Sequence, residues 1–136
     1  MTRFDAVDPT DRRKLYAEGI QAHRERGSGF VTFEADEESL AQAKGTDPDL
    51  GTPWIQFADG TINLDCTDAE LEELKGLLSE YPVFKIDELN RPEEADGVNV
   101  RISAKADPNR IGQFLDAVFR RAYGLPEEYR VWLVDL

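Results

Sequence analysis

Residues 54–66 decide the fold and read WIQFADGTINLDC. Apolar and polar side chains alternate on both sides of Asp59-Gly60, a dipeptide that tolerates the positive φ angles of a type I′ turn. The pattern predicts a β-hairpin in which every second side chain faces the core. Counting outward from a two-residue turn, the inward cross-strand pairs are Phe57 with Ile62 and Ile55 with Leu64. The outward side chains are Trp54, Gln56, Asn63 and Asp65.

Further strands are expected on both sides of this hairpin. Residues 98–106, VNVRISAKA, alternate along their whole length and predict a long strand. Its inward side chains are Val98, Val100, Ile102 and Ala104, and its outward side chains are Asn99, Arg101, Ser103 and Lys105. Shorter strands are expected at residues 30–34, 83–87 and 129–136. The last of these is too apolar for either of its faces to be fully exposed to solvent.

Three helices are predicted from capping residues and from apolar side chains at helical spacing. Their start and end signals are Asp8-Pro9 and Gly27, the Thr67 and Glu70 capping box and Pro82, and Asp107-Pro108 and Gly124. The third helix places Arg120 and Arg121 in its last turn, where the helix dipole favours cations. The acidic stretch 36–50 is expected to be a connector with one helical turn near residues 40–44.

The element order predicts a single α+β domain over residues 1–136, built as a two-layer sandwich with helices on one face of an antiparallel sheet. From Thr61 onward the order β-α-β-β-α-β is that of a ferredoxin-like plait, which an N-terminal helix and strand would extend. Read from the first helix, the order α-β-β-β-α-β-β-α is that of type III secretion chaperones. The two interpretations share their elements and differ in strand pairing.

The charge of the chain indicates adaptation to salt. The net charge is −12, the pI is near 4.5, and 11 arginines stand against 5 lysines. Carboxylates stay hydrated when salt reduces the Debye length to about 3 Å at 1 M, and a high negative charge is a feature that halophiles use. We therefore expect a halophilic protein, with an acidic mesophilic protein as the alternative.

The same composition argues against several partners and compartments. Nucleic acid is not expected, because binding it requires a basic footprint. Neither a basic leader followed by an apolar run nor 18 consecutive apolar residues occurs, so we expect no membrane partner and no export. The single cysteine fits a reducing compartment, and the predicted localisation is cytoplasmic.

The outward side chains of the predicted strands suggest a binding surface. Trp54 could stack on a ligand while Arg101 and Lys105 hold an anion. The full set of candidate binding residues is Trp54, Gln56, Asn63, Asp65, Arg101, Lys105, Arg120 and Arg121. An ordinary solvated sheet face is the alternative, and a face that joins two subunits is another.

Residues that suggest catalysis have simpler interpretations. Cys66 falls on the inward register and reads as a small buried side chain, and His23 reads as a packing residue at a helix edge. Clustered acids such as Glu93 and Glu94 are expected in so acidic a chain, and no spacing for calcium, phosphate or zinc occurs. We therefore predict no catalytic residue, no metal and no cofactor.

The C-terminal passage NVRISAKADPNRIGQFLDAVFRRAYGLPEEYRVWLVDL, with the acidic composition, resembles the small, acidic, uncharacterised proteins of haloarchaea. That resemblance names no activity. The first hypothesis is therefore a non-catalytic, dimeric binding module that contacts a small anionic ligand or a protein. The alternatives are a chaperone-like dimer that holds an extended client segment and a small enzyme that uses its acidic residues.

Overall fold

The structure is a computed structural model and describes residues 5–27, 29–36, 53–91 and 97–135. The strands are β1 (Asp5–Ala6), β2 (Val31–Ala35), β3 (Trp54–Ala58), β4 (Thr61–Cys66), β5 (Lys85–Asn90), β6 (Val98–Ser103) and β7 (Val131–Asp135). The helices are α1 (Pro9–Arg26), α3 (Asp68–Leu78), α4 (Pro108–Ala117) and a π-helical turn η2 (Val118–Ala122) that continues α4.

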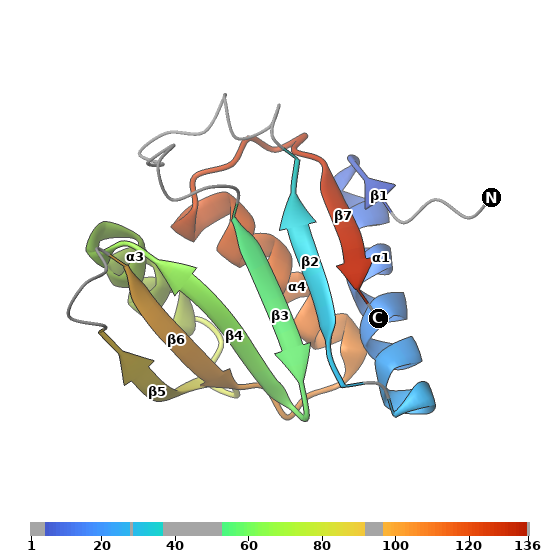
Figure 1. The fold of residues 1–136 in the computed structure, drawn as a ribbon. Helices are drawn as coiled ribbons and strands as arrows, with labels where there is room; N and C mark the ends of the chain where they lie inside the picture. Colours follow the sequence, from blue (N-terminus) through green and yellow to red (C-terminus); the bar gives the residue numbers. More distant parts are fainter. Residues whose placement is uncertain (1–4, 28, 37–52, 92–96, 136) are drawn as a thin grey trace.

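The fold is an α+β sandwich of two layers. All seven strands form one antiparallel sheet in the order β1-β7-β2-β3-β4-β6-β5. Figure 1 shows the helices together behind this sheet, with α1 behind the β7 end, α3 behind the β6 end and α4 between them. Among the described residues, none of the helices combines the length and apolar character needed to cross a membrane.

The predicted central hairpin is confirmed with its register. Asp59 and Gly60 have φ values of 50° and 75°, which are the left-handed angles that a tight hairpin turn needs. Ile55 lies opposite Leu64 and Phe57 opposite Ile62, and all four side chains are buried. The side chains that face the other way are half-buried or exposed, as the alternation requires.

The ferredoxin-like plait is not confirmed. β4, β6 and β5 are neighbours in the plait order, but the plait would place β7 directly beside β4. That edge of β4 already pairs with β3 through the hairpin, and β3 pairs with β2. β7 therefore pairs with the free edge of β2. From α1 to α4 the element order is α-β-β-β-α-β-β-α, as in the alternative interpretation based on type III secretion chaperones. β7 is an additional strand after that order.

The helix starts follow the predicted caps. Asp8 accepts a bond from the Thr10 N–H at 3.1 Å, both bonds of the Thr67 and Glu70 capping box form, and Asp107 caps α4. α3 ends at Leu78, before the predicted stop at Pro82, because the Glu80 and Tyr81 N–H groups bond three residues back and tighten the chain.

The expected boundaries of four strands shift by a few residues. The strand expected at 83–87 is β5, two residues later, because the Phe84 N–H bonds to Tyr81 O in a turn. The strand expected at 98–106 ends at Ser103, and those expected at 30–34 and 129–136 begin at Val31 and Val131. β1 was not predicted, and the expected helical turn at 40–44 lies outside the described residues.

The core lies between the sheet and the helices. Its buried apolar side chains come from the helices, from the inward strand positions and from the segments that precede β5 and β7, which supply Phe84 and Tyr129. α1 and α4 approach closely at Gly112, where an added Cβ would lie 3.0 Å from Arg13 O. Gly19 gives similar room to Leu133 and Phe33, which shows that Leu133 of β7 faces the helices. Trp132, its neighbour, therefore faces the other way.

Candidate functional site

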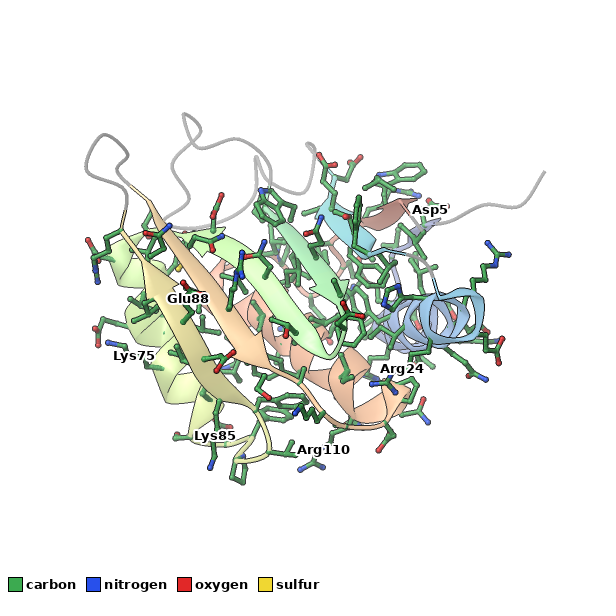
Figure 2. The ribbon with its side chains drawn as sticks, turned by 60° about the horizontal axis from the view of Figure 1, so that its bottom comes forward. Asp5, Arg24, Lys75, Lys85, Glu88 and Arg110 are labelled. Atoms are coloured by element: carbon green, nitrogen blue, oxygen red, sulfur yellow. The ribbon has the colours of Figure 1, made fainter. Side chains whose placement is uncertain are left out.

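The open face is the side of the sheet that none of the described helices covers (Figure 1). It consists of the outward strand positions Thr32, Glu34, Trp54, Gln56, Ala58, Thr61, Asn63, Asp65, Asn99, Arg101, Ser103 and Trp132. Alternation along each strand fixes this set, because the residues between them are buried under the helices. Figure 2 shows Asp5 near one edge of the sheet and Lys85 and Glu88 along β5 at the opposite edge.

A tryptophan row, defined as Trp54, Glu34 and Trp132, crosses three neighbouring strands of the open face. Glu34 is the register partner of Trp54 on β3 and of Trp132 on β7. Strands lie about 4.8 Å apart, so the two tryptophan backbones are about 10 Å apart with a carboxylate between them. Both tryptophans are half-buried, so neither residue is fully covered by the rest of the protein.

Trp132 is held by neighbours at the end of the row. Its indole Nε1–H donates to Asp36 Oδ1 at 3.1 Å. The guanidinium carbon of Arg130 lies 5.9 Å from the centre of the Trp132 ring, within the range of a cation–π contact. Arg130 also forms an ion pair with Asp5, the residue opposite Trp132 on β1. The Trp132 ring therefore already has a guanidinium beside it.

A polar row crosses the same face beside the tryptophans. Gln56 lies opposite Thr32 and Asn63, and Asn63 lies opposite Arg101. Asn99 Nδ2 donates to Asn63 Oδ1 at 2.8 Å and to Asp65 Oδ1 at 2.9 Å. These bonds fix the amide groups of β4 and β6 in place on the surface.

The structure gathers five of the eight predicted binding residues on the open face. They are Trp54, Gln56, Asn63, Asp65 and Arg101. Arg101 Nη1 lies 3.7 Å from Glu88 Oε2, so its charge is shared with a carboxylate on β5. Lys105 lies past the end of β6, beside Gly60 of the hairpin turn.

Arg120 and Arg121 lie in the helix layer, on η2, and take no part in the open face. Arg121 Nη2 contacts Glu80 Oε2 at 2.6 Å, which links η2 to the segment after α3. This hydrogen bond lowers the pKa of the exposed Glu80 carboxyl. Arg121 therefore links two parts of the helix layer, and neither arginine extends the candidate site.

The geometry around Cys66 and His23 does not suit a nucleophile and base. Burial, followed by the nearby Glu70 and Asp65 carboxylates, raises the pKa of the Cys66 thiol to about 12. His23 is buried edge-on against Phe57, with ring centres 5.6 Å apart. Phe57 pairs with Ile62, which is four residues, or about 13 Å, along β4 from Cys66. The two side chains are therefore far apart, as their interpretation as packing residues requires.

The buried carboxylate of Glu70 belongs to a helix cap. Burial raises the pKa of Glu70, but its carboxylate accepts the Thr67 N–H at 2.8 Å and so serves the capping box. Within the described ranges, no group of three or more His, Cys, Asp or Glu side chains could hold a metal ion.

A buried polar cluster ties α1 to α4 and to the start of β7. Arg12 is fully buried, and its Nε donates to Asp116 Oδ1 at 2.8 Å while Nη1 donates to Tyr129 O at 3.1 Å and to Val7 O. The Tyr129 hydroxyl donates to Asp116 Oδ1 at 2.8 Å and lies 2.5 Å from the Tyr16 hydroxyl. Burial raises the pKa of both tyrosines well above the usual value. The cluster fixes the chain on both sides of the β1–β7 pair, and so helps to position Trp132.

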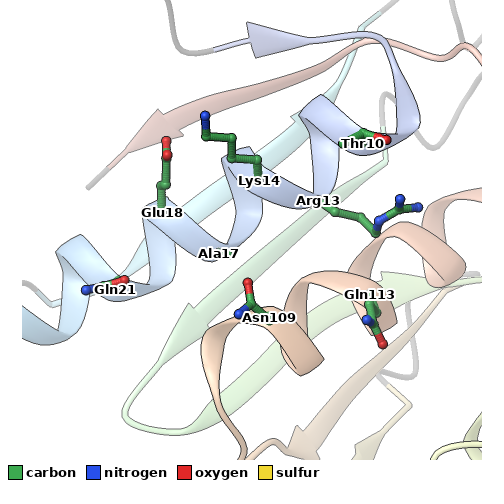
Figure 3. Close-up of a pocket in the computed structure, with 8 residues that line it drawn as sticks. All are labelled: Thr10, Arg13, Lys14, Ala17, Glu18, Gln21, Asn109 and Gln113. Carbon is green, nitrogen blue, oxygen red and sulfur yellow. The ribbon is translucent and has the colours of Figure 1, made fainter.

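A polar groove of about 580 Å³ runs between the outer sides of α1 and α4. Figure 3 shows the side chains that line it: Thr10, Arg13, Lys14, Ala17, Glu18, Gln21, Asn109 and Gln113. Both charge signs occur along it, and its residues belong to solvent-facing helix positions or their borders. This mixed lining selects no ligand class.

Sequence reasoning missed Glu34 and Trp132 as members of the site. The alternation in residues 30–34 could have placed Glu34 outward, and the parity of the last strand could have placed Trp132 on the face opposite to that of Leu133. The pairing of β7 with β2, which puts the second tryptophan beside Glu34, has no local signal in the sequence because it joins residues about 100 positions apart.

The chain belongs to a family of unknown function, DUF7975, and the match covers residues 1–136. No curated protein and no solved structure matches it. The expected membership of an uncharacterised family is thereby confirmed, and the haloarchaeal source stays a prediction.

Proposed function

We propose that this member of the DUF7975 family is a non-catalytic binding module that recognises a protein partner through its open face. The observation that carries the proposal is the tryptophan row. Eight described aromatic side chains lie in the core, at 16, 33, 57, 84, 114, 119, 123 and 129, whereas Trp54 and Trp132 are placed on the side away from it. Tryptophan carries a large apolar area and is enriched at binding surfaces, where one end is apolar and the other is wet.

The polar row supports the same proposal. Its amides are pre-ordered by hydrogen bonds, so a ligand that meets them would lose less side-chain entropy on binding. The open face is less suited to binding a small anion, which was the other predicted ligand. Arg101 faces Glu88, Lys105 lies beyond the strand, and Glu34 lies between the tryptophans.

We place this module in the cytoplasm of a salt-adapted cell. The net charge of −12 and the single cysteine support that setting. High salt weakens long-range charge steering but leaves apolar contact and short hydrogen bonds in place. An interface built on tryptophans and amides suits such a solvent.

The test is the native mass of the protein purified from its own cell extract in molar KCl. We expect a complex that Trp54→Ala and Arg101→Ala weaken, because both side chains belong to the open face. Arg120→Ala is the matched control, since Arg120 is an exposed arginine on η2 in the helix layer. A complex that survives both open-face substitutions with unchanged stoichiometry would refute the assignment.

A chaperone-like dimer that holds an extended client is the second candidate. The observation that favours it is β5, an edge strand of which five of the six residues are exposed, including Leu89 at 42%. An edge strand can pair with an added strand of another chain. A Leu89→Lys substitution should then disrupt client binding and leave Trp54-dependent binding intact. A strictly monomeric protein in molar salt contradicts this candidate.

A further inference from the structure

We propose that the tryptophan row is a guanidinium site, which binds an arginine side chain presented by the protein partner. This inference rests on the proposed function and names the chemistry that the open face recognises. It replaces an anion with a cation as the group held beside Trp54. Its basis is the charge, the spacing and the existing contacts of Trp54, Glu34 and Trp132.

The charge around the row favours a cation. Glu34 separates the two tryptophans, Asp36 bonds to Trp132, and Asp65 lies one register step beyond the Ile55–Leu64 pair, beside Trp54. Glu34 within the row and Asp36, Asp65 and Asp5 beside it are four described carboxylates, of which Asp5 is paired with the guanidinium of Arg130. A ligand of opposite sign would gain from this field, and an anion would meet repulsion from Glu34.

The spacing suits one planar cation. A cation gains from an aromatic face when it lies within about 6 Å of the ring centre. Two tryptophans about 10 Å apart across β2 can both meet that limit for a group placed above Glu34. The carboxylate beneath can then accept N–H donors from the plane of a guanidinium, in the bidentate geometry that arginine forms with carboxylates.

An internal contact already shows this chemistry at one end of the row. The guanidinium of Arg130 stands 5.9 Å from the Trp132 ring and pairs with the Asp5 carboxylate. Indole and carboxylate thus already hold one arginine of the chain itself. The Trp54 side of Glu34 offers the same two groups to an arginine from outside.

High salt selects arginine over lysine for this site. At 1 M salt the Debye length is about 3 Å, so the point charge of an exposed ammonium is strongly screened. A guanidinium is weakly hydrated and stacks on aromatic faces, so part of its binding does not depend on long-range charge. We therefore expect the preference for arginine over lysine to increase as KCl is raised.

Tryptophan fluorescence tests the site directly, because Trp54 and Trp132 are the only two tryptophans in the chain. The probe is a short peptide, blocked at both ends, with several arginines separated by glycines. The matched probe replaces each arginine with citrulline, which keeps the shape and removes the charge. In the wild-type protein we expect a saturable change with the arginine peptide and at least roughly tenfold weaker binding of the citrulline peptide.

Substitutions locate the binding on the face. Glu34→Gln should weaken the arginine peptide roughly tenfold, as expected when a charge-assisted bond is lost. Glu88→Gln is the matched control on the same face, because Glu88 contacts Arg101 and lies outside the tryptophan row. Circular dichroism establishes that both variants fold, and the citrulline comparison uses only the wild-type protein, so it does not depend on either variant.

The outcomes separate this inference from the proposed function. Equal binding of the arginine and citrulline peptides, or no saturable fluorescence change with either, overturns the guanidinium site. Equal loss of binding in Glu34→Gln and Glu88→Gln also overturns it, because the charge effect would then be general to the face. If Trp54→Ala still dissociates the native complex in any of these cases, the proposed binding module stands and only the ligand chemistry is wrong.

Discussion

Asp116→Asn should destabilise the protein strongly, and by an amount that salt does not change. The substitution removes the charge that opposes Arg12, which is fully buried. It keeps the shape of the side chain and an oxygen that can still accept from Tyr129. Burial lowers the pKa of Arg12 and the hydrogen bond with Asp116 raises it. Arginine is not deprotonated in proteins, so the guanidinium stays charged when its partner is lost.

The magnitude follows from the cost of a buried charge without its counterion. Removing one partner of a buried ion pair costs about 3–5 kcal/mol. Because asparagine retains part of the hydrogen bonding, we expect about 3 kcal/mol for Asp116→Asn and a larger loss for Asp116→Ala. The free energy of unfolding of a domain of this kind is about 5–15 kcal/mol, so the expected loss is a large fraction of the total stability.

Urea denaturation in dilute buffer and in molar KCl measures both the cost and its salt dependence. The buried pair is shielded from ions, so its cost should be the same in both solvents. Glu80→Gln is the control, because the Arg121–Glu80 pair is exposed, so its loss should cost little and molar salt should reduce that cost further. A cost below about 1 kcal/mol for Asp116→Asn, or a cost that disappears in molar KCl, would refute the buried-pair argument.

Three other predictions follow from the same structure. The free energy of unfolding should fall as KCl is lowered from molar to dilute, and a constant value would contradict the salt adaptation inferred from the charge. The pKa of the Cys66 thiol is about 12 in the folded protein and 9.0 for an unperturbed thiol, so the wild type should lose stability as the pH rises between these values. Relative to Cys66→Ala, the free energy of unfolding should fall by about 2 kcal/mol by pH 10.5. The same pH dependence of stability in both proteins would contradict this prediction. Gly112→Ala should cost about 1–3 kcal/mol because its Cβ meets the Arg13 carbonyl oxygen, whereas Gly76→Ala, on the exposed side of α3, meets nothing and should stabilise by about 0.5–1 kcal/mol in thermal melts.

Local sequence signals determined the elements of this fold. The Asp59-Gly60 turn sets the hairpin register, and alternation on its two arms assigns each side chain to one face. The caps at Asp8, Thr67 and Asp107 set the helix starts. These signals act between residues that are close in the chain, so periodicity and capping chemistry suffice to predict them.

The tertiary structure alone decided how distant elements meet. The hairpin occupies the edge of β4 that a plait would give to the last strand, so β7 pairs with β2 and brings Trp132 beside Glu34. The burial of Arg12 against Asp116 likewise joins residues 104 positions apart, in a chain where an arginine would be expected at the surface. Pairing and burial at such separations depend on which strand edges and helix faces remain free once the local elements have formed. The periodicity of the sequence does not contain that information.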